Sequence, residues 1–73
     1  MTKAEYIESL KNMSDLALYT ALKEEWSKED LMDYVEEGME DDVKIDRSLT
    51  YQEFVSIYRK DVIDTIEDVV SSI

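Results

Sequence analysis

The side chains that could do chemistry in this sequence are mostly carboxylates. Aspartate and glutamate together number 19, whereas the 73 residues contain no histidine and no cysteine. The commonest general base, the commonest transition-metal ligand and the thiol nucleophile are therefore all absent. Carboxylates on an exposed helix face are solvated and lack a pocket, so they are poor candidates for acid–base catalysis. The composition predicts a protein that is not an enzyme and that needs no cofactor.

The carboxylates are concentrated in the middle third of the chain. Residues 24–46 hold eleven acidic residues against two lysines, a net charge of −9, whereas residues 1–23 are neutral and residues 47–73 carry −2. Direct binding to nucleic acid or to an anionic membrane would work against the total charge of −11, so neither is expected as a partner. The charge instead favours a protein partner with a basic surface.

On a predicted helix that starts at Lys28, five acids of the middle third fall on one side, namely Glu29, Asp33, Glu36, Glu37 and Glu40. They lie opposite Leu31 and Val35, which predicts a continuous outward anionic ridge. Like charges four residues apart each cost a few tenths of a kcal/mol, and a sequence selected only for stability would alternate the signs. Tyr34 lies between the apolar and acidic faces, where an aromatic side chain can anchor a partner. The candidate partner-binding residues are Glu29, Asp33, Tyr34, Glu36, Glu37, Glu40, Asp41 and Asp42.

Carboxylates on a helix face lie roughly 5 to 6 Å apart, a spacing comparable to that of phosphates along a nucleic-acid strand. In this character the chain resembles phage-encoded inhibitors that mimic DNA or RNA or occupy a basic site on a host protein. The resemblance implies binding to a basic, nucleic-acid-binding surface and inhibition or modulation of the partner. The competing interpretation is a structural or regulatory helical module, including a homodimer, whose interface is the apolar edge of Ile63 and Val70 while the acids only confer solubility.

The segment from residue 42 to residue 54 resembles the calcium loop of an EF-hand. Lys44 replaces the ligand expected at position 3, and Arg47 replaces the glycine that the sharp turn at position 6 favours. A degenerate, EF-hand-like calcium module is therefore an alternative function, and no metal ligand is assigned. With Asp42 at position 1, oxygen-bearing side chains fall at positions 5, 9 and 12, namely Asp46, Thr50 and Glu53.

The apolar residues recur at helical spacing, and the chain has no proline and one glycine, Gly38. These features predict an all-α fold, a compact bundle of about four helices that forms one domain over residues 1–73. Side chains able to cap a helix start stand at Thr2, Ser14, Ser27 and Thr50. The predicted helices end near Asn12, Trp26, Gly38 and Ile73, and a polar connector covers residues 40–48.

The last predicted helix is the longest, with five to six turns. Ile63 and Val70 lie beside its main apolar stripe and widen it, which indicates either burial by the preceding helices, the simpler account, or a dimer seam. The main stripe consists of Phe54, Val55, Tyr58, Val62, Ile66, Val69 and Ile73.

Features that would direct the chain to a membrane or out of the cell are not recognisable. The first ten residues contain no apolar run followed by a small-residue cleavage site, and no stretch approaches the roughly 20 apolar residues that span a bilayer. Because the absence of cysteine also fits a reducing compartment, we expect a cytoplasmic protein.

Overall fold

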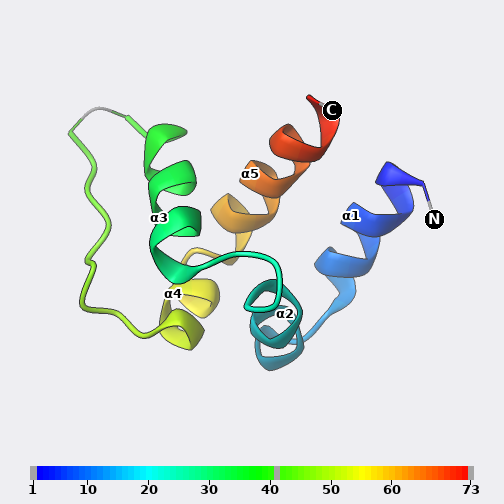
Figure 1. Cartoon of the computed structure of the whole chain (residues 1–73), viewed down its shortest axis with the longest axis horizontal. Helices are drawn as coiled ribbons and strands as arrows, with labels where there is room; N and C mark the ends of the chain where they lie inside the picture. The colour runs from blue at the N-terminus through cyan, green and yellow to red at the C-terminus, as the bar shows by residue number, and fades with distance from the viewer. Residues whose placement is uncertain (1, 41, 73) are drawn as a thin grey trace.

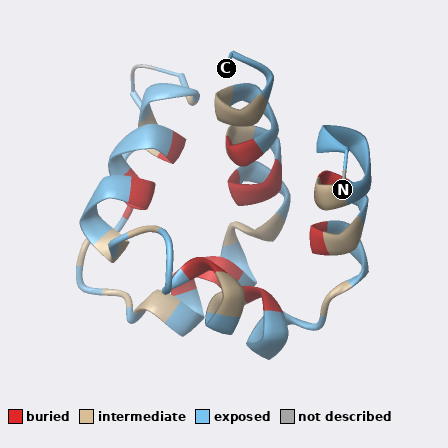
Figure 2. Cartoon of the chain, turned by 45° about the vertical axis from the view of Figure 1, so that its right-hand side comes forward, coloured by how far each residue is buried: buried red, intermediate tan, exposed pale blue. Residues whose placement is uncertain are grey.

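A computed structural model describes residues 2–40 and 42–72, and the chain is helical over most of this length (Figure 1). Three helices stand side by side with α5 in the middle, and the short α2 and α4 lie across one end (Figure 2). The described residues form no strand, so the all-α prediction is confirmed. The helices are α1 (Lys3–Asn12), α2 (Asp15–Leu22), α3 (Lys28–Glu37), α4 (Tyr51–Ile57) and α5 (Arg59–Ser71).

The first four helices begin at the capping residues that the sequence predicts. In each case the side-chain oxygen accepts a hydrogen bond from a backbone amide of the first turn. Thr50 forms a reciprocal capping box with Glu53, because the Glu53 carboxylate also accepts from the Thr50 amide at 3.0 Å. Ser27 accepts from the Asp30 amide at 3.1 Å, so the start of α3 was readable from the local sequence.

Apolar side chains from all five helices meet in one core. The connector between α3 and α4 also contributes, because Ile45 is only 4% exposed whereas Val43 remains exposed. No polar or charged side chain among the described residues is fully buried, so burial of apolar surface holds the helices together. The core consists of Ile7, Leu10, Leu18, Leu22, Leu31, Met32, Val35, Ile45, Phe54, Val55, Val62, Ile63 and Ile66.

The predicted long C-terminal helix is divided in two at Tyr58. This residue has φ −106° and ψ 26°, outside the helical range, and α4 and α5 run in different directions on either side of it (Figure 1). The bend lets α4 pack on α2 while α5 packs on α1 and α3. Periodicity did not reveal the break, because the apolar spacing continues through it without a glycine or proline.

The break also changes which residues of α5 face the core. Ile63 is buried and Val70 packs against the core, although both lie off the stripe predicted for a continuous helix. Ile63 is therefore covered within one chain, as the simpler account of this edge expects, and Val70 is partly covered. Ile73, the last residue of the predicted stripe, lies outside the described residues.

The second predicted helix ends earlier than expected, at Leu22 and not near Trp26. The amides of Glu25 and Trp26 both donate to the Leu22 carbonyl, at 3.0 and 2.9 Å, which closes a turn after the helix. The Tyr51 hydroxyl donates to the Trp26 carbonyl at 3.0 Å, and burial together with the neighbouring Tyr19 raises the pKa of Tyr51 to about 12. The start of α4 therefore fixes the segment that leads into α3.

Arg59, the first residue of α5, ties together the ends of three helices. Its guanidinium donates to the carbonyls of Leu10, Lys11 and Met13 at the end of α1, with the Lys11 bond at 3.0 Å. It also pairs with Asp15, the first residue of α2, at 2.9 Å. Carbonyls at a helix end lack partners within the helix, and a cation there is favourable for the helix dipole.

Replacement of Arg59 by alanine should destabilise the fold by about 2 kcal/mol, because charge-assisted bonds to otherwise unpaired carbonyls are lost. The matched control is Lys60→Ala, which removes an exposed cation one residue further along the same helix. We expect the control to change the free energy of unfolding by less than about 0.5 kcal/mol. Urea denaturation followed by circular dichroism measures both values, and equal losses would contradict this role for Arg59.

Candidate functional site

Helix α3 carries the candidate site on the side opposite its buried face. Leu31, Met32 and Val35 point into the core with exposures of 1% or less, which fixes the orientation of the helix. Seven of the eight candidate residues belong to the described part of the chain, and Asp41 lies outside it. The carboxylates of α3 fall into two groups, which differ in whether the chain itself supplies them with a cation.

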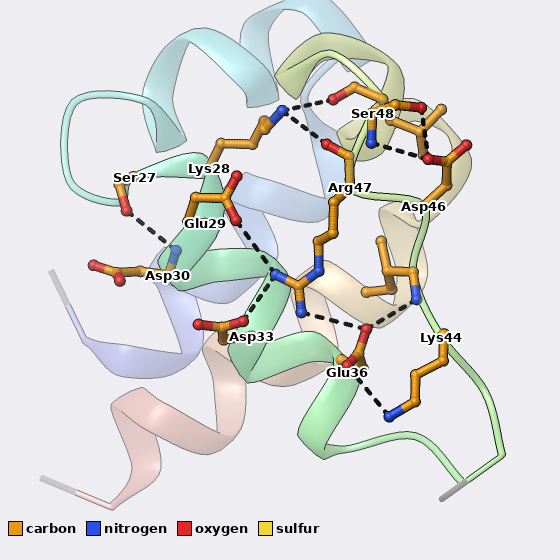
Figure 3. A network of polar contacts seen from close by, with 12 residues as sticks. Ser27, Lys28, Glu29, Asp30, Asp33, Glu36, Lys44, Asp46, Arg47 and Ser48 are labelled. Carbon is orange, nitrogen blue, oxygen red and sulfur yellow. Dashed lines mark hydrogen bonds and ion pairs between the residues drawn. The ribbon is translucent and has the colours of Figure 1, made fainter.

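The first group, which we call the paired stripe, consists of Glu29, Asp33 and Glu36. The guanidinium of Arg47, from the connector between α3 and α4, lies against all three carboxylates (Figure 3). The nitrogen–oxygen distances are 3.6 Å to Glu29, 2.8 Å to Asp33 and 3.3 Å to Glu36. The sequence predicted one uninterrupted anionic ridge, but the connector crosses α3 and places a cation on part of it.

Glu36 is the most enclosed member of the paired stripe. Its carboxylate accepts a hydrogen bond from the Ile45 amide at 2.9 Å and lies 3.9 Å from Lys44. The Ile45 amide lowers the pKa of Glu36 below its ordinary value, and the charges of Arg47 and Lys44 act in the same direction. This carboxylate is therefore held ionised where it attaches the connector to α3.

Lys28 holds the other end of the same connector. Its ammonium donates to the carbonyl of Arg47 at 3.2 Å and to that of Leu49 at 2.9 Å (Figure 3). The lysine that begins α3 is thus bonded to backbone oxygens of the connector. The position of the Arg47 backbone is consequently fixed on α3 by contacts that do not involve its own guanidinium.

The second group, which we call the open stripe, consists of Asp30, Tyr34 and Glu37. Tyr34 is 47% exposed, and its ring meets the edge of Trp26 at a centroid distance of 5.5 Å and an interplanar angle of 88°. A shallow pocket is lined by the open stripe together with Asp33 of the paired stripe. Within residues 2–40 and 42–72, neither Asp30 nor Glu37 forms an ion pair.

The remaining candidate acids lie beyond the end of α3. The helix ends at Glu37 with Gly38 as its C-cap, so Glu40 and Asp42 belong to the connector and do not extend the helical ridge. Both are exposed, and Glu40 lines a shallow pocket with Lys44 next to Glu36. The candidate acids are therefore grouped on α3, and Glu40 and Asp42 lie beyond the C-terminal end of this helix.

Two carboxylates of the EF-hand-like segment, those of Asp46 and Glu53, accept hydrogen bonds from backbone amides of the same segment. Asp46 accepts from the Ser48 amide at 2.9 Å and from its hydroxyl at 2.6 Å, and these bonds lower the pKa of Asp46. Glu53 accepts from the Thr50 amide, which lowers the pKa of Glu53. Across the described parts of the chain, no three acidic, histidine or cysteine side chains gather closely enough to hold a metal ion. The resemblance to a calcium loop therefore does not extend to the arrangement of the ligands.

Sequence reasoning missed Arg47, Lys28 and Asp30 as parts of this site. It considered Arg47 only as a misfit at the turn of a calcium loop. The available signal was a single arginine between a run of acids and a helix cap. Residue spacing alone, however, does not predict which helix a connector packs against. Trp26, predicted from the sequence as a helix end, is partly buried, and its ring packs edge to face with that of Tyr34.

The fold and the site define a small all-helical protein with an aromatic residue set among carboxylates on one helix. Comparison of the chain with protein families, with curated proteins and with solved structures finds no match. None of the helices in the described chain is both long and apolar enough to cross a membrane. The surface of α3 is therefore the feature from which a function can be inferred.

The attachment of the connector by Glu36 predicts a specific pH dependence. Because its pKa is lower in the folded than in the unfolded chain, the charge of Glu36 stabilises the fold fully above its ordinary pKa of 4.5 and loses this effect as the pH falls through the lower folded value. The difference in free energy of unfolding between the wild type and Glu36→Gln should therefore shrink as the pH falls below about 4.5.

Glu37→Gln is the matched control, since it removes a neighbouring carboxylate that lacks an ion pair in the described chain. Its effect on the free energy of unfolding at pH 7 should stay within about 0.5 kcal/mol. Urea denaturation across pH 3 to 7 measures both variants. A Glu36→Gln difference that persists unchanged at the lowest pH would show that this carboxylate does not hold the connector through its charge.

Proposed function

We propose that this chain is a small acidic binding protein that docks the open stripe of α3 on a basic surface of another protein and thereby inhibits or modulates it. The observation that carries the proposal is Tyr34, half-exposed, supported from behind by Trp26 and bordered by carboxylates. Aromatic anchors surrounded by polar groups are typical of the residues that dominate binding energy at protein interfaces.

The charge distribution supports a basic partner. The net charge of −9 over residues 24–46 gives a strong local field, which steers a positively charged surface toward α3 and accelerates encounter. Lysine and arginine side chains of the partner would meet Asp30 and Glu37, whose charges the described chain does not pair. The ring of Tyr34 adds a face on which a cationic side chain can rest.

The finer form of the proposal concerns the kind of basic surface. Asp30, Asp33 and Glu37, which line one pocket with Tyr34, stand on successive turns of α3 about 5 to 6 Å apart, close to the repeat of phosphates along a nucleic-acid strand. A partner that normally binds DNA or RNA would therefore present cations at a matching interval. In this form the chain competes with nucleic acid for the partner, in the manner of a nucleic-acid mimic.

The alternative of a homodimer joined by the α5 edge gains no support from this arrangement. Ile63 is 5% exposed and belongs to the core of one chain, and Val70 packs partly buried against that core. The apolar edge on which the alternative rested is thus largely covered within the chain.

The carboxylates whose pKa is lowered, such as Glu36 and Glu53, are held ionised and serve as local hydrogen-bond acceptors.

The test compares two variants that remove the same charge from different faces. The first variant, Asp30→Asn/Tyr34→Ala/Glu37→Gln, alters the open stripe and leaves the paired stripe, which holds the connector, intact. The matched control, Ile57→Ala/Asp64→Asn/Asp68→Asn, removes two exposed carboxylates from α5 and one side chain of α4 that is 64% exposed. Both variants carry a net charge of −9.

Each protein is immobilised and used to capture soluble proteins at low salt, with elution by a salt gradient. A basic protein retained by the wild type and the control, but not by the open-stripe variant, is then purified and its affinity measured by calorimetry. We expect the open-stripe variant to bind it at least tenfold more weakly than the control does. Equal affinities of the two variants would refute the assignment of the interface to α3.

A further inference from the structure

Arg47 neutralises carboxylates on the same helix that carries the proposed interface. Its guanidinium pairs with all three members of the paired stripe at 2.8 to 3.6 Å. The two stripes are adjoining, because Asp33 both accepts from Arg47 and lines the pocket with Tyr34. A cation of the chain itself therefore lies where a basic partner bound at Tyr34 would place its next cation.

The backbone around Arg47 is anchored without its guanidinium. Ile45 is buried at 4% exposure, its amide donates to Glu36, and Lys28 donates to the carbonyls of Arg47 and Leu49. The Arg47 side chain itself is 37% exposed. The guanidinium can therefore leave the paired stripe by rotation of its side chain while the connector stays on α3.

We infer that Arg47 is an autoinhibitory contact, an internal guanidinium that occupies the paired stripe until an arginine of the partner replaces it. The inference rests on the proposed function, since it extends the same interface by one stripe. Exchange of one guanidinium for another preserves the bonds to Glu29, Asp33 and Glu36, so displacement costs little beyond the loss of an intramolecular contact in water. Because the Arg47 side chain is 37% exposed, it can change rotamer without any movement of the connector backbone.

Besides occupying the paired stripe, Arg47 would make binding to this stripe selective for arginine over lysine. A partner cation must compete with a guanidinium that is already held by three carboxylates, which a lysine ammonium matches less well than an arginine does. Basic surfaces with scattered lysines would therefore bind only the open stripe. Surfaces that present arginine would gain both stripes.

The test measures the affinity of a defined cationic probe, an eight-residue arginine peptide, by calorimetry at low salt. Arg47→Gln removes the internal guanidinium and should bind the peptide about fivefold more tightly than the wild type. Lys60→Gln is the matched control, because it gives the same net charge of −12 by a change on α5. We expect the control to alter the affinity less than twofold, and an equal gain in both variants would overturn the inference as a mere effect of net charge.

A second measurement on the wild type keeps the inference testable even if Arg47→Gln folds poorly. In a two-dimensional ¹H–¹⁵N spectrum, the Nε–H signal of Arg47 should move toward the position of a solvated arginine as the arginine peptide is added. An eight-residue lysine peptide should move it less. An Arg47 signal that stays in place while the arginine peptide saturates the protein would overturn displacement.

The open-stripe variant Asp30→Asn/Tyr34→Ala/Glu37→Gln separates the two proposals. Binding that this variant loses, but that Arg47→Gln does not strengthen, would overturn autoinhibition and leave the proposed function standing. If the open-stripe variant binds the peptide as tightly as the wild type does, the open stripe is not part of the cation-binding surface, and the interface to which autoinhibition was assigned does not exist. Both proposals then fail.

Discussion

The guanidinium of Arg59 joins the end of α1 to the starts of α2 and α5, and the arrangement of the bundle depends on this junction. Helix α5 occupies the middle of the row of three helices, so the direction in which it leaves Tyr58 decides where α1 and α3 can pack (Figure 2). The bend at Tyr58 coincides with the point where Arg59 meets the carbonyls of α1. A single cation thus satisfies groups that would otherwise be unpaired and sets the axis of the central helix.

The same use of cations recurs at the other side of the molecule. With 19 acidic and eight basic residues, the chain cannot pair each carboxylate with a cation. Lys28 and Arg47 serve the connector between α3 and α4, just as Arg59 serves the junction of α1 with α2. Carboxylates near these structural cations hold the connector and the helix junction, whereas Asp30 and Glu37 form no ion pair within the described residues and are available for other contacts.

Features that depend on neighbouring residues in sequence could be predicted, and those that depend on distant contacts could not. The starts of four helices followed from a capping side chain and the phase of the apolar residues, both of which are local. The break at Tyr58 has no local signal, and the adjoining Arg59 bonds to carbonyls that lie 46 to 49 residues before it in the chain. The division of the acidic face into two stripes was equally hidden, since it depends on the path of the connector over α3. Tyr34, which the sequence places between the apolar and acidic faces of the helix, is 47% exposed.

The pairing of α1 with α5 has a consequence for the order in which the chain acquires its structure. Helix α1 is synthesised before α5, on which it packs, so Ile7 and Leu10 lack this cover until α5 has left the ribosome. Contacts between residues so far apart form only after the intervening loops have closed, which slows the final docking step relative to formation of the individual helices. During translation the nascent chain consequently exposes an apolar face on α1, flanked by lysines, to whatever chaperones scan newly made proteins.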